Sequence, residues 1–193
     1  MGTNLAIMLL SYLLGSIPTA YLFSRLVKKV DIRNEGSGNI GGMNAYRIAG
    51  LVPGILTVLI DAIKGALAVL IVLFFSGDLP VVFICGFLAV AGHNYSLFMK
   101  FRGGKGLATT LGLFVVLSPV SILFAILCAV ILTLILKDIN TAFGSAALSI
   151  PVIVWLQYQH WGWFFFGLSL AIVIVIKHIP DYRAYAQGRR RFI

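Results

Sequence analysis

Two glycine-rich polar segments hold most of the residues in this chain that could do chemistry. The first contains, in order, Ser37, Gly38, Asn39, Asn44 and Arg47. These residues offer a hydroxyl, two amides and a guanidinium that can hold two phosphate oxygens at once. Glycine lets the backbone approach a ligand closely, and successive backbone N–H groups form a cradle for an anion. A plain loop between helices does not need this combination, so the segment predicts a phosphate-binding site.

The second segment contains Gly103, Gly104, Lys105 and Gly106, directly before a helix that is predicted to begin at Leu107. It lacks the spacing of a nucleotide-binding P-loop and the Ser or Thr that follows the lysine there, so a nucleoside triphosphatase is not indicated. Backbone N–H groups, a lysine and the N-terminus of a helix all favour an anion. Together the two segments suggest an enzyme or a carrier for phosphorylated small molecules.

Asp61 and Lys64 lie three residues apart, about midway along an apolar run. Charged side chains at such a depth usually face the interior of a helix bundle and pair with each other. A structural ion pair that fixes helix packing and a catalytic pair both fit this pattern. His93 lies in a later apolar run, and two roles fit it as well: a general base, or a packing group that forms hydrogen bonds.

The residue pattern does not support metal catalysis or serine hydrolysis. The chain has six Asp and Glu residues and three His residues, and no spacing among them forms a metal-ligand set. It contains no Gly-x-Ser-x-Gly elbow. Catalysis would therefore rely on backbone amides and on Ser, Asn, Lys, Arg and His side chains, which suit phosphate binding and the stabilisation of a developing oxyanion.

The elements that must position these residues are membrane helices. The chain has 193 residues, of which 60% are hydrophobic and 11% are charged, and its mean hydropathy is +1.02. These values lie outside the soluble range and indicate an all-α, polytopic integral membrane protein with a single membrane-embedded domain over residues 1–193. The net charge of +9 arises mainly between apolar runs, so topology explains it and nucleic acid is not an expected partner.

Seven apolar runs are predicted to form transmembrane helices. They cover residues 5–23, 51–75, 79–99, 107–117, 120–136, 142–156 and 161–176. The fourth run is short, and a turn at Ser118-Pro119 is expected to separate it from the fifth.

The distribution of Lys and Arg sets the predicted orientation, because cytoplasmic loops are enriched in these residues. With seven spans and an outside N-terminus, the basic residues between spans fall on the cytoplasmic side, together with a tail that begins at His178 and includes Arg189, Arg190 and Arg191. Six spans would put Lys137 or the tail outside. We therefore expect a cytoplasmic C-terminus and both glycine-rich segments at the cytoplasmic face.

The motifs resemble a known family when they are taken in order. They are Gly-Ser-Gly-Asn-Ile-Gly with a later Asn and Arg, then Asp61-x-x-Lys64-Gly, then Gly-His93, then a basic residue with Gly-Gly-Lys-Gly-x-Ala-Thr. This order resembles the bacterial acyl-phosphate-dependent glycerol-3-phosphate acyltransferase family (PlsY), over almost the full chain. The resemblance implies a seven-helix protein of the bacterial inner membrane with a cytoplasm-facing site.

The resemblance implies the reaction as well. A fatty acyl group passes from acyl phosphate to glycerol 3-phosphate, giving lysophosphatidic acid and phosphate, the first acylation of phospholipid synthesis. It implies no metal, no other cofactor and no covalent intermediate. The implied partners are the two substrates, membrane lipid and the enzyme that makes acyl phosphate.

Individual roles are implied in the same way. Ser37, Arg47, Lys105 and His178 would hold the phosphate of glycerol 3-phosphate, and His93, Lys105 and His178 are the candidates for a catalytic role.

Other residues would shape the acyl phosphate site. They are Asn39, Asn44 and the glycines at 103, 104 and 106.

The C-terminal tail departs from the family pattern, because Asp181 stands where the family has Asn and Arg183 is displaced by one position. A carboxylate beside a dianionic substrate repels it unless a base such as Arg183 pairs with it. Asp181 therefore leaves two alternatives for the function of the protein. It could use another alcohol phosphate as acceptor, or it could be a non-catalytic homologue that binds lipid. A transporter or flippase for a phosphorylated metabolite is a third, although the chain shows no repeated halves.

Overall fold

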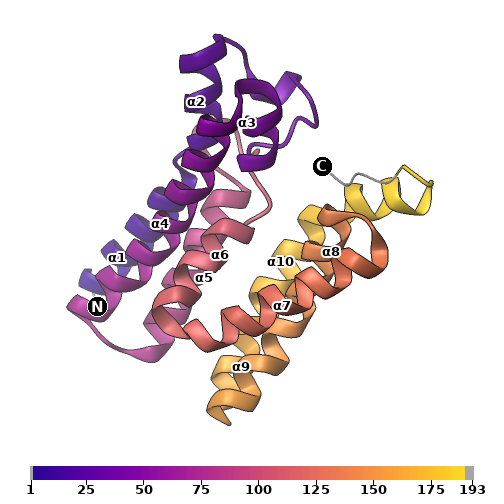
Figure 1. Ribbon diagram of the computed structural model, residues 1–193. Helices are drawn as coiled ribbons and strands as arrows, with labels where there is room; N and C mark the ends of the chain where they lie inside the picture. The colour runs from indigo at the N-terminus through magenta and orange to yellow at the C-terminus, as the bar shows by residue number, and fades with distance from the viewer. Residues whose placement is uncertain (1, 190–193) are drawn as a thin grey trace. The chain divides into compact units, whose positions relative to one another are not determined.

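A computed structural model describes residues 2–189, and every regular element in that part of the chain is helical (Figure 1). The all-α prediction is therefore confirmed. The helices form two compact units, Met1–Val116 and Leu117–Ile193. The single domain over residues 1–193 stays a prediction, and Arg190 and Arg191 of the basic tail lie outside the described residues.

The N-terminal unit is built around three long helices, α1, α4 and α5, which pack side by side (Figure 1). Its elements are α1 (Gly2–Ser16), α2 (Thr19–Lys28), η1 (Ile32–Asn34), α3 (Gly42–Ala49), α4 (Leu51–Phe75), α5 (Leu79–Asn94), η2 (Leu97–Met99) and α6 (Leu107–Leu117). The shorter helices α2 and α3 pack on each other and on α4. They hold the first glycine-rich segment at one end of the unit.

Glycines let these helices approach closely. A Cβ at Gly15 on α1 would lie 2.0 Å from the carbonyl oxygen of Ala89 on α5, and one at Gly65 on α4 would lie 2.0 Å from that of Thr109 on α6. Small residues at such contacts are typical of membrane helix packing, where van der Waals contact replaces the hydrophobic effect as the main attraction.

The first apolar run is interrupted, which the hydropathy pattern did not predict. Helix α1 ends at Ser16 and α2 begins at Thr19, with Pro18 between them. Proline has no N–H group to donate to the preceding turn, so the helix breaks there.

The C-terminal unit contains α7 (Pro119–Leu136), α8 (Ile139–Ala146), η3 (Ala147–Ser149), α9 (Ile150–Tyr158) and α10 (Trp161–Ala186). The predicted turn at Ser118-Pro119 is confirmed, because α6 ends at Leu117 and α7 begins at Pro119. Proline fits the first turn of a helix, where its missing N–H would have no intrahelical partner.

The last helix corrects the prediction that a tail begins at His178. Helix α10 continues through Pro180 to Ala186. Hydropathy falls after Ile176, but falling hydropathy marks the end of the apolar run and not the end of the helix. His178 and Asp181 therefore lie one turn apart on a regular helix.

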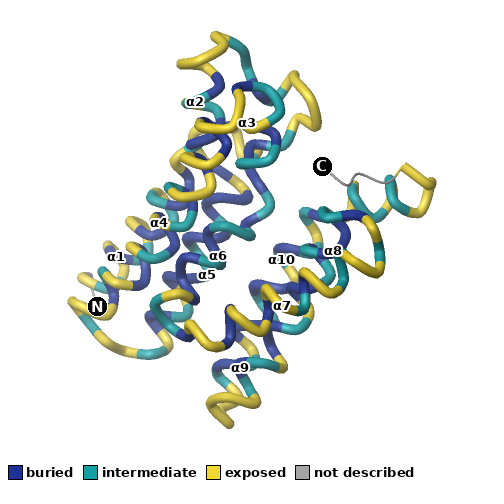
Figure 2. Tube along the Cα trace, viewed as in Figure 1, coloured by how far each residue is buried: buried dark blue, intermediate teal, exposed yellow. Residues whose placement is uncertain are grey.

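Six helical segments among the described residues are long and apolar enough to cross a membrane, and α6, with 11 residues, is shorter. Their exposed positions carry large apolar side chains, such as Leu59 and Ile63 on α4, and buried and exposed positions alternate along the long helices (Figure 2). This pattern fits lipid-facing surfaces. The count of seven spans and the outside N-terminus stay predictions.

Candidate functional site

The first glycine-rich segment is a loop that leads into a helix. Gly36 and Gly38 adopt left-handed backbone angles, with φ of +58° and +70°, which glycine reaches without steric cost. Ser37 and Gly38 are exposed at the tip, and α3 begins at Gly42. Arg47 lies in the last turn of that helix. The loop tip is therefore open to a water-soluble ligand.

Asn44 holds this loop together from inside. Its side chain is 1% exposed. The Nδ2 group donates to the carbonyl oxygens of Ile32, Glu35 and Asn39 at 3.3, 3.1 and 3.1 Å, and Oδ1 accepts from the backbone N–H of Ser37 at 3.0 Å. Because its donors and its acceptor all go to the loop backbone, Asn44 shapes the loop and does not present its amide to the surface.

Replacing Asn44 with Asp is expected to destabilise the loop strongly. The substitution keeps the shape of the side chain but replaces the amide nitrogen, a donor, with a carboxylate oxygen. That oxygen would face three carbonyl oxygens. Leaving buried polar groups without partners costs about 1–3 kcal/mol. Thermal unfolding and limited proteolysis of the purified protein measure this, with Asn34→Asp, an exposed position in η1, as the matched control. Equal behaviour of the two variants would show that Asn44 does not support the loop.

A surface ion pair precedes the loop. Asp31 caps η1, and its carboxylate binds the guanidinium of Arg33 at 2.5 Å. The hydrogen bond from Arg33 holds the pKa of Asp31 below its ordinary value. The pair therefore stays ionised at neutral pH, although exposed pairs contribute little stability.

The second glycine-rich segment lies against the end of α5. The backbone N–H of Gly104 donates to the carbonyl oxygen of His93 at 3.0 Å. A Cβ at Gly103 would lie 2.1 Å from that oxygen, and one at Gly104 would lie 2.1 Å from His93 Nε2 and 2.8 Å from the carbonyl oxygen of Ile40. No larger residue fits this contact. Since Ile40 belongs to the first segment, the two glycine-rich segments lie side by side.

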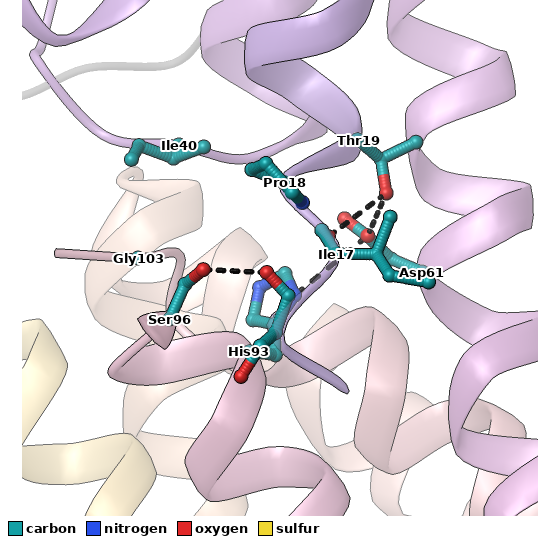
Figure 3. A pocket seen from close by; sticks show the side chains of 9 residues that line it. Ile17, Pro18, Thr19, Ile40, Asp61, His93, Ser96 and Gly103 are labelled. Atoms are coloured by element: carbon teal, nitrogen blue, oxygen red, sulfur yellow. Dashed lines mark hydrogen bonds and ion pairs between the residues drawn. The ribbon is translucent and has the colours of Figure 1, made fainter. Parts of the chain in front are cut away.

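A small polar pocket opens where the two segments meet. Ile40 and Gly103 lie on one side of it, with Asp61 on the other (Figure 3). Thr19, His93 and Ser96 also line it. Thr19 and Ser96 did not stand out in the sequence; the position of Thr19 directly after Pro18, at the start of a helix, was the available signal.

Asp61, which lines the pocket, pairs with Lys64 on α4, and both side chains are buried. Lys64 Nζ lies 2.6 Å from Asp61 Oδ1 and donates to the carbonyl oxygen of Ile17 at 2.7 Å. Thr19 Oγ1 donates to Asp61 at 2.9 Å, and His93 Nδ1 lies 3.7 Å from the same carboxylate. The predicted pairing is confirmed. The pair spans the break between α1 and α2, since Lys64 binds the end of one helix and Asp61 the start of the next.

In the C-terminal unit, His178 and Asp181 both lie on α10. His178 is buried, and its Nδ1 lies 2.8 Å from the carbonyl oxygen of Ile174. Carbonyl oxygens only accept, so Nδ1 carries a proton. Asp181 is partly buried. Sequence reasoning missed Gly144 and Tyr182, which contact His178.

No group of three or more His, Cys, Asp or Glu residues within residues 2–189 is placed to hold a metal ion. Arg47 and Lys105 belong to the two glycine-rich segments, Arg47 in the last turn of α3 and Lys105 between Gly104 and Gly106.

Comparison with known proteins gives concordant matches. The family model for glycerol-3-phosphate acyltransferase matches residues 5–188. A glycerol-3-phosphate acyltransferase of Syntrophotalea carbinolica is 48% identical over 158 residues, 79% of this chain and 79% of the relative. One from Trichlorobacter lovleyi is 39% identical over 168 residues, 87% of this chain and 86% of the relative.

Solved structures agree. The crystal structure of PlsY (YgiH), an integral membrane glycerol 3-phosphate acyltransferase, in its glycerol 3-phosphate form has a TM-score of 0.90 and 31% identity, covering 98% of this chain and 94% of that one. Its lysophosphatidic acid form has a TM-score of 0.86 and 29% identity over the same shares of the two chains. The resemblance in the motifs is confirmed.

Proposed function

Because the chain belongs to the glycerol-3-phosphate acyltransferase family, we propose that it transfers a fatty acyl group from acyl phosphate to glycerol 3-phosphate. It is an integral membrane acyltransferase that acylates glycerol 3-phosphate. The choice of acyl phosphate as donor is the proposal. The observation that supports it is the contact between Ile40 and Gly104, which puts two glycine-rich phosphate cradles side by side.

The reaction needs alignment more than covalent catalysis. Acyl phosphate is a mixed anhydride, so phosphate is already a good leaving group. A hydroxyl oxygen of glycerol 3-phosphate attacks the acyl carbon and forms the ester bond. The bond from that carbon to the phosphate oxygen breaks, phosphate keeps the electron pair, and the hydroxyl proton passes to a phosphate oxygen. The enzyme has to bring two anions together and offset their repulsion.

The proposed roles follow the chemistry of each residue. Ser37, Arg47, Lys105 and His178 bind the acceptor phosphate, since they supply a hydroxyl, two cationic groups and an imidazole. The glycine backbone at 103, 104 and 106 and the loop that Asn44 holds bind the donor phosphate.

His93 and the Asp61–Lys64 pair are assigned a supporting role. His93 lies between the buried pair and the place where the two glycine-rich segments meet. It contacts Asp61 on one side and Gly104 on the other.

The site is proposed to face the cytoplasm. The end of the N-terminal unit that carries the glycine-rich loop also carries exposed Lys28 and Lys29 at the end of α2. Basic residues mark the cytoplasmic ends of membrane helices.

Purified protein in lipid nanodiscs, given radiolabelled glycerol 3-phosphate, tests the donor directly. Lysophosphatidate is expected with palmitoyl phosphate, and not with palmitoyl-CoA or a palmitoyl carrier-protein thioester. Product from either thioester with none from palmitoyl phosphate would overturn the proposed donor.

The same assay with a panel of alcohol phosphates tests the acceptor. Glycerol 3-phosphate is expected to give the highest kcat/KM. Asp181→Asn, which restores the residue of the family pattern, is expected to raise kcat/KM for glycerol 3-phosphate, because it removes a negative charge near a dianionic substrate. Preference for another alcohol phosphate in both forms would overturn the acceptor assignment.

A further inference from the structure

We propose that Gly144 of α8 and Tyr182 of α10 are positioning residues that seat the imidazole of His178 for the acceptor phosphate. The inference rests on the proposed role of His178 in binding that phosphate. It concerns only contacts within the C-terminal unit.

The orientation of the His178 ring is fixed at one nitrogen. Nδ1 donates to the carbonyl oxygen of Ile174 at 2.8 Å, four residues earlier on α10. This bond sets which nitrogen carries the proton in the neutral ring. Rotation of the ring about its χ2 angle would break the bond. The imidazole therefore has one favoured placement on the helix.

Gly144 forms one wall of the space that holds the ring. A Cβ at this position would lie 2.6 Å from Cγ and 2.8 Å from Cδ2 of His178, and 2.8 Å from Oη of Tyr182. Such distances are closer than van der Waals contact permits, so the ring lies against bare backbone. Glycine inside a helix destabilises it relative to alanine. Its presence within α8 is thus explained by the space that it leaves for the imidazole and the tyrosine.

Tyr182 forms a second wall. It follows His178 by one turn on the same face of α10, and the two ring centroids are 6.5 Å apart at an interplanar angle of 41°. Its hydroxyl lies next to Gly144 and interacts with the side chain of Ser145. Gly144 and Tyr182, with the Ile174 carbonyl, therefore hold the imidazole from three directions.

An alanine at position 144 must displace both the imidazole and the hydroxyl end of Tyr182. Displacing a substrate-binding group by about 1 Å commonly lowers the rate by about 100-fold. For Gly144→Ala we expect kcat/KM for glycerol 3-phosphate to fall by about 10- to 100-fold, with the KM for acyl phosphate unchanged. Tyr182→Ala, which removes the second wall without introducing a clash, is expected to raise the KM for glycerol 3-phosphate. Tyr182→Phe, which keeps the ring, is expected to stay within about threefold of the unchanged protein, because only the hydroxyl is lost.

Gly167→Ala on α10 is the matched control. Its Cβ would lie 2.8 Å from Cα of Pro151, which is equally crowded, but no atom of His178 is among its nearest neighbours. It is expected to lower the thermal unfolding temperature with little change in the KM for glycerol 3-phosphate. If Gly144→Ala and Gly167→Ala have the same kinetic profile, position 144 acts through stability alone and the inference is wrong.

The decisive comparison is made in a His178→Ala background. There the new methyl group no longer meets the imidazole, and only the Tyr182 hydroxyl, at the end of a side chain, stays close to it. Adding Gly144→Ala is therefore expected to cause no further loss of kcat/KM. A full additional loss would overturn the positioning role. If instead His178→Ala alone keeps the original KM for glycerol 3-phosphate, the proposed phosphate-binding role of His178 itself fails, which distinguishes the two failures.

Discussion

Replacing Arg47 or Lys105 with alanine is expected to lower acyl transfer by roughly 30- to 4000-fold, because removing the charged partner of a buried or bound ion commonly costs about 2–5 kcal/mol. Each residue belongs to one of the two glycine-rich segments, Arg47 at the end of α3 and Lys105 between Gly104 and Gly106. Two anionic substrates repel each other, so each lost cation should act mainly on the barrier to their approach. The initial rate with palmitoyl phosphate measures the effect.

Two further variants separate this role from bulk charge. Lys28→Ala removes an equally basic side chain from the exposed end of α2, and it should keep most of the activity. Arg47→Lys keeps the charge but loses the planar guanidinium that holds two phosphate oxygens. Its rate of acyl transfer should lie between that of the native protein and that of Arg47→Ala. Full activity in both Arg47→Ala and Lys105→Ala, with normal membrane insertion, would contradict the assignment of either residue to the phosphate.

The meeting of the two glycine-rich segments could be predicted from the sequence because topology and composition agreed. Charge asymmetry predicted one face for both segments, and glycine beside Arg or Lys predicted an anion at each. The structure brings Ile40 of one to Gly104 of the other. The helical runs were predictable for the same reason, since long apolar segments in a membrane must satisfy their backbone internally.

The role of Asn44 could not be read from the sequence. An amide in a glycine-rich motif offers the same donors and acceptor to a ligand as to its own loop, and only the folded backbone shows which takes them. Here three carbonyls and one N–H of residues 32–39 do so. The same limit applies to Gly144, since its contact with His178 depends on the register between two helices.

The break at Pro18 and the extension of α10 through Pro180 show why proline alone predicts little in a membrane helix. The same residue type interrupts one helix and is tolerated inside another. At Pro18 the freed ends are bound by side chains from α4, with Lys64 on the Ile17 carbonyl and Asp61 on the Thr19 hydroxyl. Partners from neighbouring helices decide the outcome, and sequence does not show them.

Because Asp61 and Lys64 hold the two helix ends at this break, replacing one of them is expected to have a large effect on stability. Asp61→Leu alone leaves the buried ammonium of Lys64, which is 3% exposed, without its carboxylate, and removing one partner of a buried pair typically destabilises by about 3–5 kcal/mol. For a chain of this size this corresponds to a fall in the unfolding temperature of roughly 2–4 °C per kcal/mol. Thermal unfolding of the purified protein measures it.

Asp31→Asn is the matched control, because it removes a carboxylate from the partly buried pair with Arg33 at the surface and is expected to cost about 0–1 kcal/mol.

The double variant Asp61→Leu with Lys64→Met replaces both buried charges with apolar groups and should recover most of the lost stability. Its activity then decides between the two roles of the pair. A stable and active double variant would mean that the pair only fixes helix packing. A stable but inactive one would mean that Asp61, through Thr19 and His93, holds the pocket between the phosphate cradles in its working shape. If Asp61→Leu unfolds at the same temperature as Asp31→Asn, the bracing of the helix break by this pair is wrong.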